Sequence, residues 1–452
     1  MINEALRAAT SRQGIRRVLT TPLYANALYI MLSTAVMGLC GFFFWLIVAR
    51  FYSEAVVGYS SAIISALNLL AVFCLVGLDI SLVRFLPQAD NPRRMINTCF
   101  TLGGLVSLLA AGIFLAGLGV WSPALTFVRE NAVFCLAFLL FAVLWTLSPL
   151  IDAAFLAKRR AGFALAKNAI FSLLKIPLPV LLALYFQAFG AVASWGIALA
   201  VALAVAMLLF LPRVQDGYRP LPALDLGVFR KQWRYSSGNY LVNLLSAAPA
   251  YLLPLMVVNL LGAEQNAYFY IAWMMANLLF AIAVGVSRSL FAEGSHFEDR
   301  LRENVVKSLK STFLLLVPAA ILLAAAGKWL LLVFGQGYSL NALPLLWVLC
   351  FSSLPLGVNH IYTGMLRVTG RITELIIIWG FIAIGILVAS YLLLPLTGII
   401  GIGYAWLGAQ LIVAIYILAS RKLIPPLTHI YLLSPTSLRG RSPKAISPIT
   451  SH

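Results

Sequence analysis

The sequence has unusually few charged residues. Only 10% of its 452 residues are Asp, Glu, Lys or Arg and 62% are hydrophobic, whereas roughly a quarter of a soluble domain is charged. Such a chain has too little polar surface for a soluble globular fold. Because a backbone in lipid must satisfy its own hydrogen bonds, the composition predicts an all-α polytopic membrane protein.

Among the charged residues, the acidic ones are the fewer. The chain has 14 Asp and Glu against 32 Lys and Arg, a net charge of +18, and every acidic residue falls in an expected loop, tail or span end. In a soluble protein this excess would suggest nucleic acid. Here the basic residues stand between apolar runs, as in loops at a cytoplasmic surface, so no nucleic-acid partner is expected. An exporter of organic cations needs an anion inside the membrane, which this sequence does not offer.

Catalytic and metal-binding signatures are also missing. The five cysteines lie inside apolar runs without a CxxC pair, which is typical of small core residues. The four histidines form no HExxH motif, and there is neither a GxSxG motif nor a Walker loop. We therefore expect no enzyme, no metal site and no cofactor. Any transport would be driven by an ion or substrate gradient, or by consumption of the product.

Long apolar runs dominate the rest of the chain. Twelve are long enough to cross a hydrocarbon core about 30 Å thick. The long connection 212–237 is a predicted cytoplasmic linker between two sets of six, 23–211 and 238–420. A basic segment, 1–22, precedes them, and a Pro- and Ser-rich tail, 421–452, is expected to be disordered. The predicted spans are 25–49, 56–78, 96–120, 131–151, 163–187, 190–211, 238–261, 267–290, 312–334, 343–363, 374–395 and 398–420.

Basic residues alternate between the two sides of this topology. The side with both tails and every second loop carries 27 of the 32 Lys and Arg. The opposite side carries only Arg50, Arg129 and Lys328. By the positive-inside rule, both termini are predicted to lie in the cytoplasm.

The fifth span contains two lysines. Lys175 lies about 17 Å along the helix from Ala164, near the middle of the membrane, where a charge normally faces a protein interior or a wet cavity. Pro177 and Pro179 are predicted to break the helix beside it. We interpret Lys175 as a cationic group for an anionic substrate. The alternative is a core lysine bonded to carbonyls that the two prolines leave free.

Further charged candidates lie near span ends. Lys167, and Arg288 at the inner end of the eighth span, would add to a positive field, unless they extend to the lipid headgroups. Asp79, Arg84 and Asp152 are candidates for a charged gate on the cytoplasmic side, with anchoring at the membrane surface as the alternative. Asp79 and Arg84 are five residues apart, so they do not share a helical face.

Four stretches resemble bacterial polysaccharide or O-antigen flippases of the Wzx type. This family belongs to the multidrug, oligosaccharidyl-lipid and polysaccharide exporter superfamily, and the resemblance covers about residues 20–420. The stretches are NALYIMLSTAVMGLCGFFFWLIVARFYSEAVVGYSSA, GLDISLVRFLP, LIDAAFLAKRRAGFALAKNAIFSLLKIPLP and VGVSRSLFAEGS.

The resemblance implies two six-helix lobes around a central cavity that opens alternately to each side. Its implied substrate is an undecaprenyl-pyrophosphate-linked oligosaccharide, moved from the inner to the outer leaflet, with H⁺ or Na⁺ as a coupling ion. Membrane lipids, and a polymerase and glycosyltransferases of the same pathway, are the implied partners. Lys175, Lys167 and Arg288 match the family's cavity cations by place and type. Two alternatives stay open: a related carrier of lipid precursors or small organic solutes, and a non-transporting membrane partner of a polysaccharide assembly complex.

Overall fold

The computed structural model describes residues 22–183, 189–294 and 301–420, and within these residues every regular element is helical. The basic segment 1–22, except for its last residue, and the tail 421–452 lie outside the described residues. The helices are α3 (Pro22–Phe51), α4 (Glu54–Leu75), α5 (Leu78–Phe85), η1 (Leu86–Gln88), α6 (Pro92–Ala116), α7 (Leu118–Trp121), η2 (Pro123–Leu125), α8 (Phe127–Glu130), α9 (Ala132–Ala157), α10 (Ala161–Leu174), α11 (Leu178–Ala183), α12 (Gly190–Val205), the π-helix η3 (Ala206–Phe210), α13 (Leu211–Val214), α14 (Leu226–Leu260), α15 (Ala263–Gly294), α16 (Leu301–Phe334), α17 (Gln336–Asn341), α18 (Leu343–Val368), α19 (Ile372–Thr397) and α20 (Ile400–Ala419).

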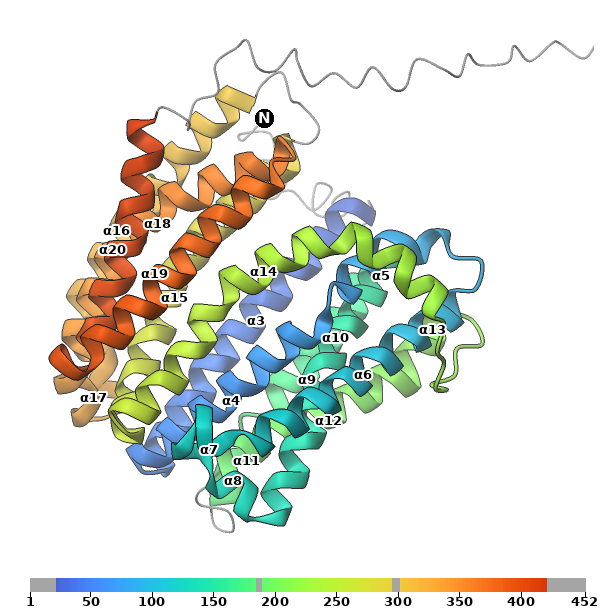
Figure 1. The fold of residues 1–452 in the computed structure, drawn as a ribbon, viewed down its shortest axis with the longest axis horizontal. Coiled ribbons are helices and arrows are strands. Elements are labelled where there is room, and N and C mark those ends of the chain that lie inside the picture. Colours follow the sequence, from blue (N-terminus) through green and yellow to red (C-terminus); the bar gives the residue numbers. More distant parts are fainter. Residues whose placement is uncertain (1–21, 184–188, 295–300, 421–452) are drawn as a thin grey trace, which may run out of the picture.

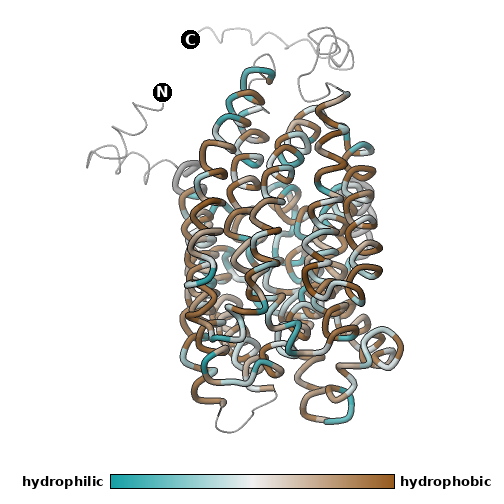
Figure 2. Tube along the Cα trace, turned by 90° about the vertical axis from the view of Figure 1, so that its left-hand side faces the viewer, coloured by the Kyte–Doolittle hydropathy of each residue, from teal (hydrophilic) through white to brown (hydrophobic). Residues whose placement is uncertain are grey.

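The prediction of an all-α protein with twelve spans is confirmed. The described residues contain 12 helical segments long and apolar enough to cross a membrane, from Leu28–Phe51 to Ile400–Ala419. Hydrophobic residues run along the body of the bundle, and hydrophilic ones gather toward its two ends (Figure 2). We call the end where α3 begins and α20 finishes the inner end. The opposite end, which carries the α3–α4 and α14–α15 turns, is the outer end.

Several helices are longer than the hydrophobic pattern predicts. The segment 212–237, predicted as a linker, is helical from Leu226 onward, where α14 begins. The connection between the predicted spans 267–290 and 312–334 is helical up to Gly294 and again from Leu301. Hydropathy detects only the part of a helix that lies in lipid. Polar turns continue beyond it, as where Lys307 Nζ pairs with Glu303 Oε1 at 2.6 Å one turn away.

The helices pack as two groups, α3–α13 and α14–α20 (Figure 1). In the first, α9 packs on α4, α5 and α6; in the second, α18 lies among α15, α16 and α20. The long helix α14 runs along both groups, against α4 on one side and α19 on the other. Apart from α14, the main contacts between the groups are α4 with α15 and α3 with α16.

Candidate functional site

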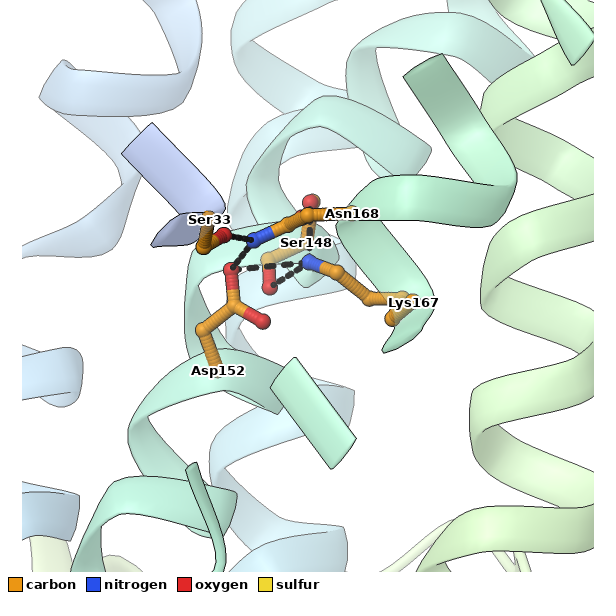
Figure 3. Close-up of polar contacts among 5 residues, drawn as sticks. All are labelled: Ser33, Ser148, Asp152, Lys167 and Asn168. Carbon is orange, nitrogen blue, oxygen red and sulfur yellow. Dashed lines mark hydrogen bonds and ion pairs between the residues drawn. The ribbon is translucent and has the colours of Figure 1, made fainter. Parts of the chain in front are cut away.

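A buried charged cluster joins α9 and α10 (Figure 3). Lys167 Nζ lies 2.8 Å from Asp152 Oδ2, and it also donates to the hydroxyl and the carbonyl of Ser148 at 2.8 and 3.1 Å. The Lys167 side chain is fully buried, and that of Asp152 is 26% exposed. Asn168 donates to Ser33 of α3 at 3.0 Å and to the same Asp152 oxygen at 3.5 Å. These contacts compensate the charge of Lys167 within the first helix group, so Lys167 does not extend to the headgroups.

The turn between α9 and α10 brings this pair together. It consists of residues 158–160, with Arg159 in the left-handed region at φ +55°. Asp152 stands six residues before the turn, and Lys167 stands seven after it. The two therefore lie at nearly the same depth on adjacent antiparallel helices. The sequence pattern assigns Lys167 and Asp152 to separate sites. Their similar spacing from a basic turn was the signal that could have paired them.

The three predicted gate residues line one pocket at the inner end of the first group. Asp79 and Arg84 of α5 face Asp152 of α9 across a space of about 450 Å³. A sharp turn places α5 there, with Val76 and Gly77 at φ +47° and +76°. The Asp79 carboxyl lies outside the membrane-spanning segments, and its burial raises its pKa above the ordinary value of 3.8.

Lys175 lies in an aromatic enclosure. It follows the last residue of α10, and α11 starts only at Leu178, so the helix is interrupted at 175–177 beside Pro177. The Lys175 side chain is 2% exposed. Its ammonium lies 4.7, 4.9 and 6.0 Å from the ring centres of Phe171, Trp195 and Phe44. No hydrogen bond or ion pair of Lys175 occurs among the described residues, so ring faces carry the electrostatic stabilisation of its charge.

The outer ends of the two groups are joined by polar contacts, which we call the outer seam (Arg50, Glu54, Gly58, Asn266 and Tyr268). The Asn266 side-chain amide donates to the Gly58 carbonyl at 2.7 Å and to Ser61 Oγ at 3.0 Å. The Tyr268 hydroxyl donates to Glu54, and Arg50 Nε donates to the carbonyl of Val333 at 2.7 Å. A Cβ on Gly58 would overlap the carbonyl of Ala263, so only glycine allows this approach of α4 and α15.

Two cations, Arg288 and Arg367, cluster beside His360 near the inner end of the second group. The Ser287 hydroxyl donates to the His360 carbonyl at 2.6 Å, which fixes α15 against α18. Gly364 makes this approach possible, because a Cβ there would lie 2.6 Å from Ser287 Oγ. Arg367 follows His360 by seven residues, about two helical turns, on the same face of α18.

The two arginines of this cluster are exposed and form no ion pair among the described residues. Both arginines are exposed, and their charges act on each other and on His360. The ion pairs found in the described part of the chain include neither of them. The sequence indicates Arg288 as a candidate but neither Arg367 nor His360, because only the packing of α15 on α18 brings these two residues close to Arg288.

Helical geometry gives the direction in which Arg288 points. It follows Tyr270 by 18 residues, five turns at about 3.6 residues per turn, so both project from the same face of α15. The Tyr270 ring lies 4.7 Å from that of Trp45 in α3. One face of α15 therefore contacts the first group at Tyr270 and is exposed at Arg288, about 27 Å closer to the inner end of the bundle.

The fold is that of a class of membrane transporters. A multidrug resistance MATE family transporter of the MOP superfamily, solved inward-facing, superposes with a TM-score of 0.68 at 15% identity, over 89% of this chain and 99% of that one. The lipid II flippase MurJ superposes with a TM-score of 0.72 at 14% identity, over 88% of each chain. A MOP superfamily transporter from Pyrococcus furiosus gives 0.60 at 15% identity, over 92% of this chain and 98% of that one. At these identities the likeness establishes the fold.

The family follows from the sequence itself. Residues 47–341, more than half of the chain, match the family of polysaccharide biosynthesis proteins, and the chain belongs to this family. A protein of Shigella flexneri that carries the provisional name of O-antigen transporter is 23% identical over 181 residues. That match spans 39% of this chain and 43% of the Shigella protein, less than half the length of each. The match over residues 47–341 thus confirms the predicted resemblance at the level of the polysaccharide biosynthesis family, and the solved structures confirm the predicted fold.

Proposed function

We propose that this protein is a flippase for an undecaprenyl-pyrophosphate-linked oligosaccharide, such as an O-antigen, capsule or exopolysaccharide repeat unit. In this proposal both termini are cytoplasmic, the protein lies in a bacterial plasma membrane, and the substrate crosses from the inner to the outer leaflet. Family membership and the similarity to an O-antigen transporter support the substrate class.

The observation that carries the proposal is the exposed pair Arg288 and Arg367. A pyrophosphate presents oxygens that two guanidinium groups can bind through charge-assisted hydrogen bonds. A carrier of organic cations would gain nothing from two uncompensated positive charges there. Arg288 stands on the side of α15 that faces the first helix group, at the end where that face is exposed.

The contacts between the groups suggest how the cycle proceeds. With the outer seam closed and Arg288 exposed, a substrate head group from the inner leaflet reaches the arginines first. Breaking the seam and closing the inner ends would then present the head group to the outer leaflet, while the prenyl chain stays in lipid. Lys167 and Lys175 are enclosed in this conformation, so we assign substrate contact here to Arg288 and Arg367.

The test is to measure flipping in proteoliposomes that contain a fluorescent undecaprenyl-pyrophosphate sugar. The flipping rate is the rate at which the fluorescent lipid becomes accessible to an impermeant quencher. We expect Arg288→Ala to lower the flipping rate strongly and Arg288→Lys to retain part of it, because a point charge binds phosphate without the bidentate geometry. Lys328→Ala, which removes an exposed cation near the outer end, serves as the matched control. Equal rates in all variants would refute the cationic site. No flipping by folded wild-type protein would favour a solute carrier or a non-transporting partner.

A further inference from the structure

A groove of about 790 Å³ lies between the inner parts of α19 and α20, outside the proposed transport site. One end of the groove is polar and is formed by Gly370, Arg371, Thr373 and Glu374. The rest of its wall is largely apolar. That wall consists of Ile372, Ile377, Ile378, Phe381, Ile412, Val413 and Tyr416. A polar end joined to an apolar channel is the shape of a site for an amphiphile.

The dimensions of the groove match one membrane leaflet. Arg371 directly precedes α19, at the inner end of the bundle. From Arg371 to Phe381 is ten residues, about 15 Å of helix, which is half of a hydrocarbon core about 30 Å thick. The polar end therefore lies at the inner membrane surface, and the apolar part reaches approximately to the middle of the bilayer.

The groove opens toward lipid. Ile377 and Phe381, on its wall, are 64% and 52% exposed. The same stripe of α19 continues with Ile384 and Val388, which are also apolar and exposed. An unbroken apolar stripe on a spanning helix faces hydrocarbon. The groove is thus accessible to molecules that diffuse within the inner leaflet.

The polar end carries both signs of charge. Arg371 Nη2 lies 2.5 Å from Glu374 Oε2, and the Tyr362 hydroxyl donates to the other oxygen of Glu374 at 2.5 Å. Arg371 remains 52% exposed and has further N–H donors for a phosphate, while the Glu374 carboxylate, 17% exposed and already bonded to Arg371 and Tyr362, adds a negative charge that attracts an ammonium group. A net negative head group would instead bring a second anion beside Glu374. We propose that this groove is a binding site for a zwitterionic phospholipid of the inner leaflet, with its phosphate at Arg371 and one acyl chain along Ile377 and Phe381.

The experiment is native mass spectrometry of the purified full-length protein offered phosphatidylethanolamine, phosphatidylglycerol or undecaprenyl phosphate. We expect one phosphatidylethanolamine to be retained in preference to the other two lipids. Phe381→Trp and Ile377→Trp, which fill the groove, should each lower that retention several-fold. Ile384→Trp enlarges an exposed side chain of the same stripe beyond the groove and should leave retention unchanged.

A charge variant tests the head group separately. Glu374→Gln leaves Arg371 without its counter-charge, so the preference should shift from phosphatidylethanolamine toward phosphatidylglycerol. Equal retention of all lipids, or equal effects of the groove and control tryptophans, would overturn the proposal. So would preferred retention of undecaprenyl phosphate, which would assign the groove to a polyprenyl chain. Because retention is measured without transport, this result and the outcome of the flipping test are independent.

Discussion

Gly58→Ala tests whether the outer seam holds the outer ends of the two helix groups together. The added Cβ would overlap the carbonyl of Ala263, so α4 and α15 must separate wherever the seam is closed. Inserting one methyl group into a packed interface typically costs about 1–3 kcal/mol. A difference of this size between two states changes their equilibrium ratio roughly 5–150-fold. The cost falls only on conformations with a closed seam, so the population should shift toward an outward-open state.

The matched control for this substitution is Gly285→Ala in α15. A Cβ on Gly285 has no neighbour within 4 Å, and both variants gain the same helix propensity, up to about 1 kcal/mol. Comparing the two variants therefore isolates the steric overlap at the seam.

The assay is double electron–electron resonance between spin labels on the two groups at the outer end. In a background without the native cysteines, labels at Phe51→Cys and Leu340→Cys fit, because both side chains are exposed there, at 58% and 68%. We expect a new population at longer distance in Gly58→Ala and none in Gly285→Ala. Identical distance distributions in the two variants, at equal thermal stability, would refute the role of the seam.

Three further substitutions test the charged groups of the first helix group. Lys167→Met should lower the free energy of unfolding, and with it the melting temperature, because it leaves the Asp152 carboxylate unpaired. The loss is up to about 3–5 kcal/mol before it is discounted for the partial exposure of Asp152. The double variant Lys167→Met/Asp152→Asn should recover part of the loss in the same thermal unfolding assay, and a double variant no more stable than the single variant would argue against the pair. Lys175→Met should keep the protein folded. If the enclosed ammonium is structural, the flipping rate should equal that of wild type and of Lys175→Arg. Loss of flipping in Lys175→Met, with flipping retained in Lys175→Arg, would instead give Lys175 a part in the transport cycle. Asp79→Asn should raise the melting temperature at neutral pH, because the buried carboxyl has a raised pKa and its ionised form is penalised only in the folded state. The gain should disappear below the ordinary carboxyl pKa of 3.8, where folded and unfolded chains are both protonated, and a gain independent of pH would contradict this explanation.

Much of the architecture could be predicted from the sequence by itself. The thickness of the hydrocarbon core and the need to satisfy every backbone hydrogen bond within lipid make twelve long apolar runs into twelve helices, whatever their packing. The scarcity of acidic residues and the missing catalytic motifs are likewise properties of the sequence alone, and the four stretches that resemble polysaccharide flippases indicated the family that the match over residues 47–341 confirms. The interruption after Lys175 also has a local cause, because Pro177 removes a backbone donor.

The partners of the charged side chains were decided only by the tertiary structure. A pattern in one helix does not determine how that helix is rotated against a neighbour far away in the chain. This rotation pairs Lys167 with Asp152, surrounds Lys175 with rings from α3, α10 and α12, and brings Arg367 of α18 beside Arg288 of α15. The outer seam depends in the same way on the missing side chain of Gly58, whose importance appears only when α15 lies against it. Spans are set by the solvent around each helix, whereas sites are set by contacts between helices.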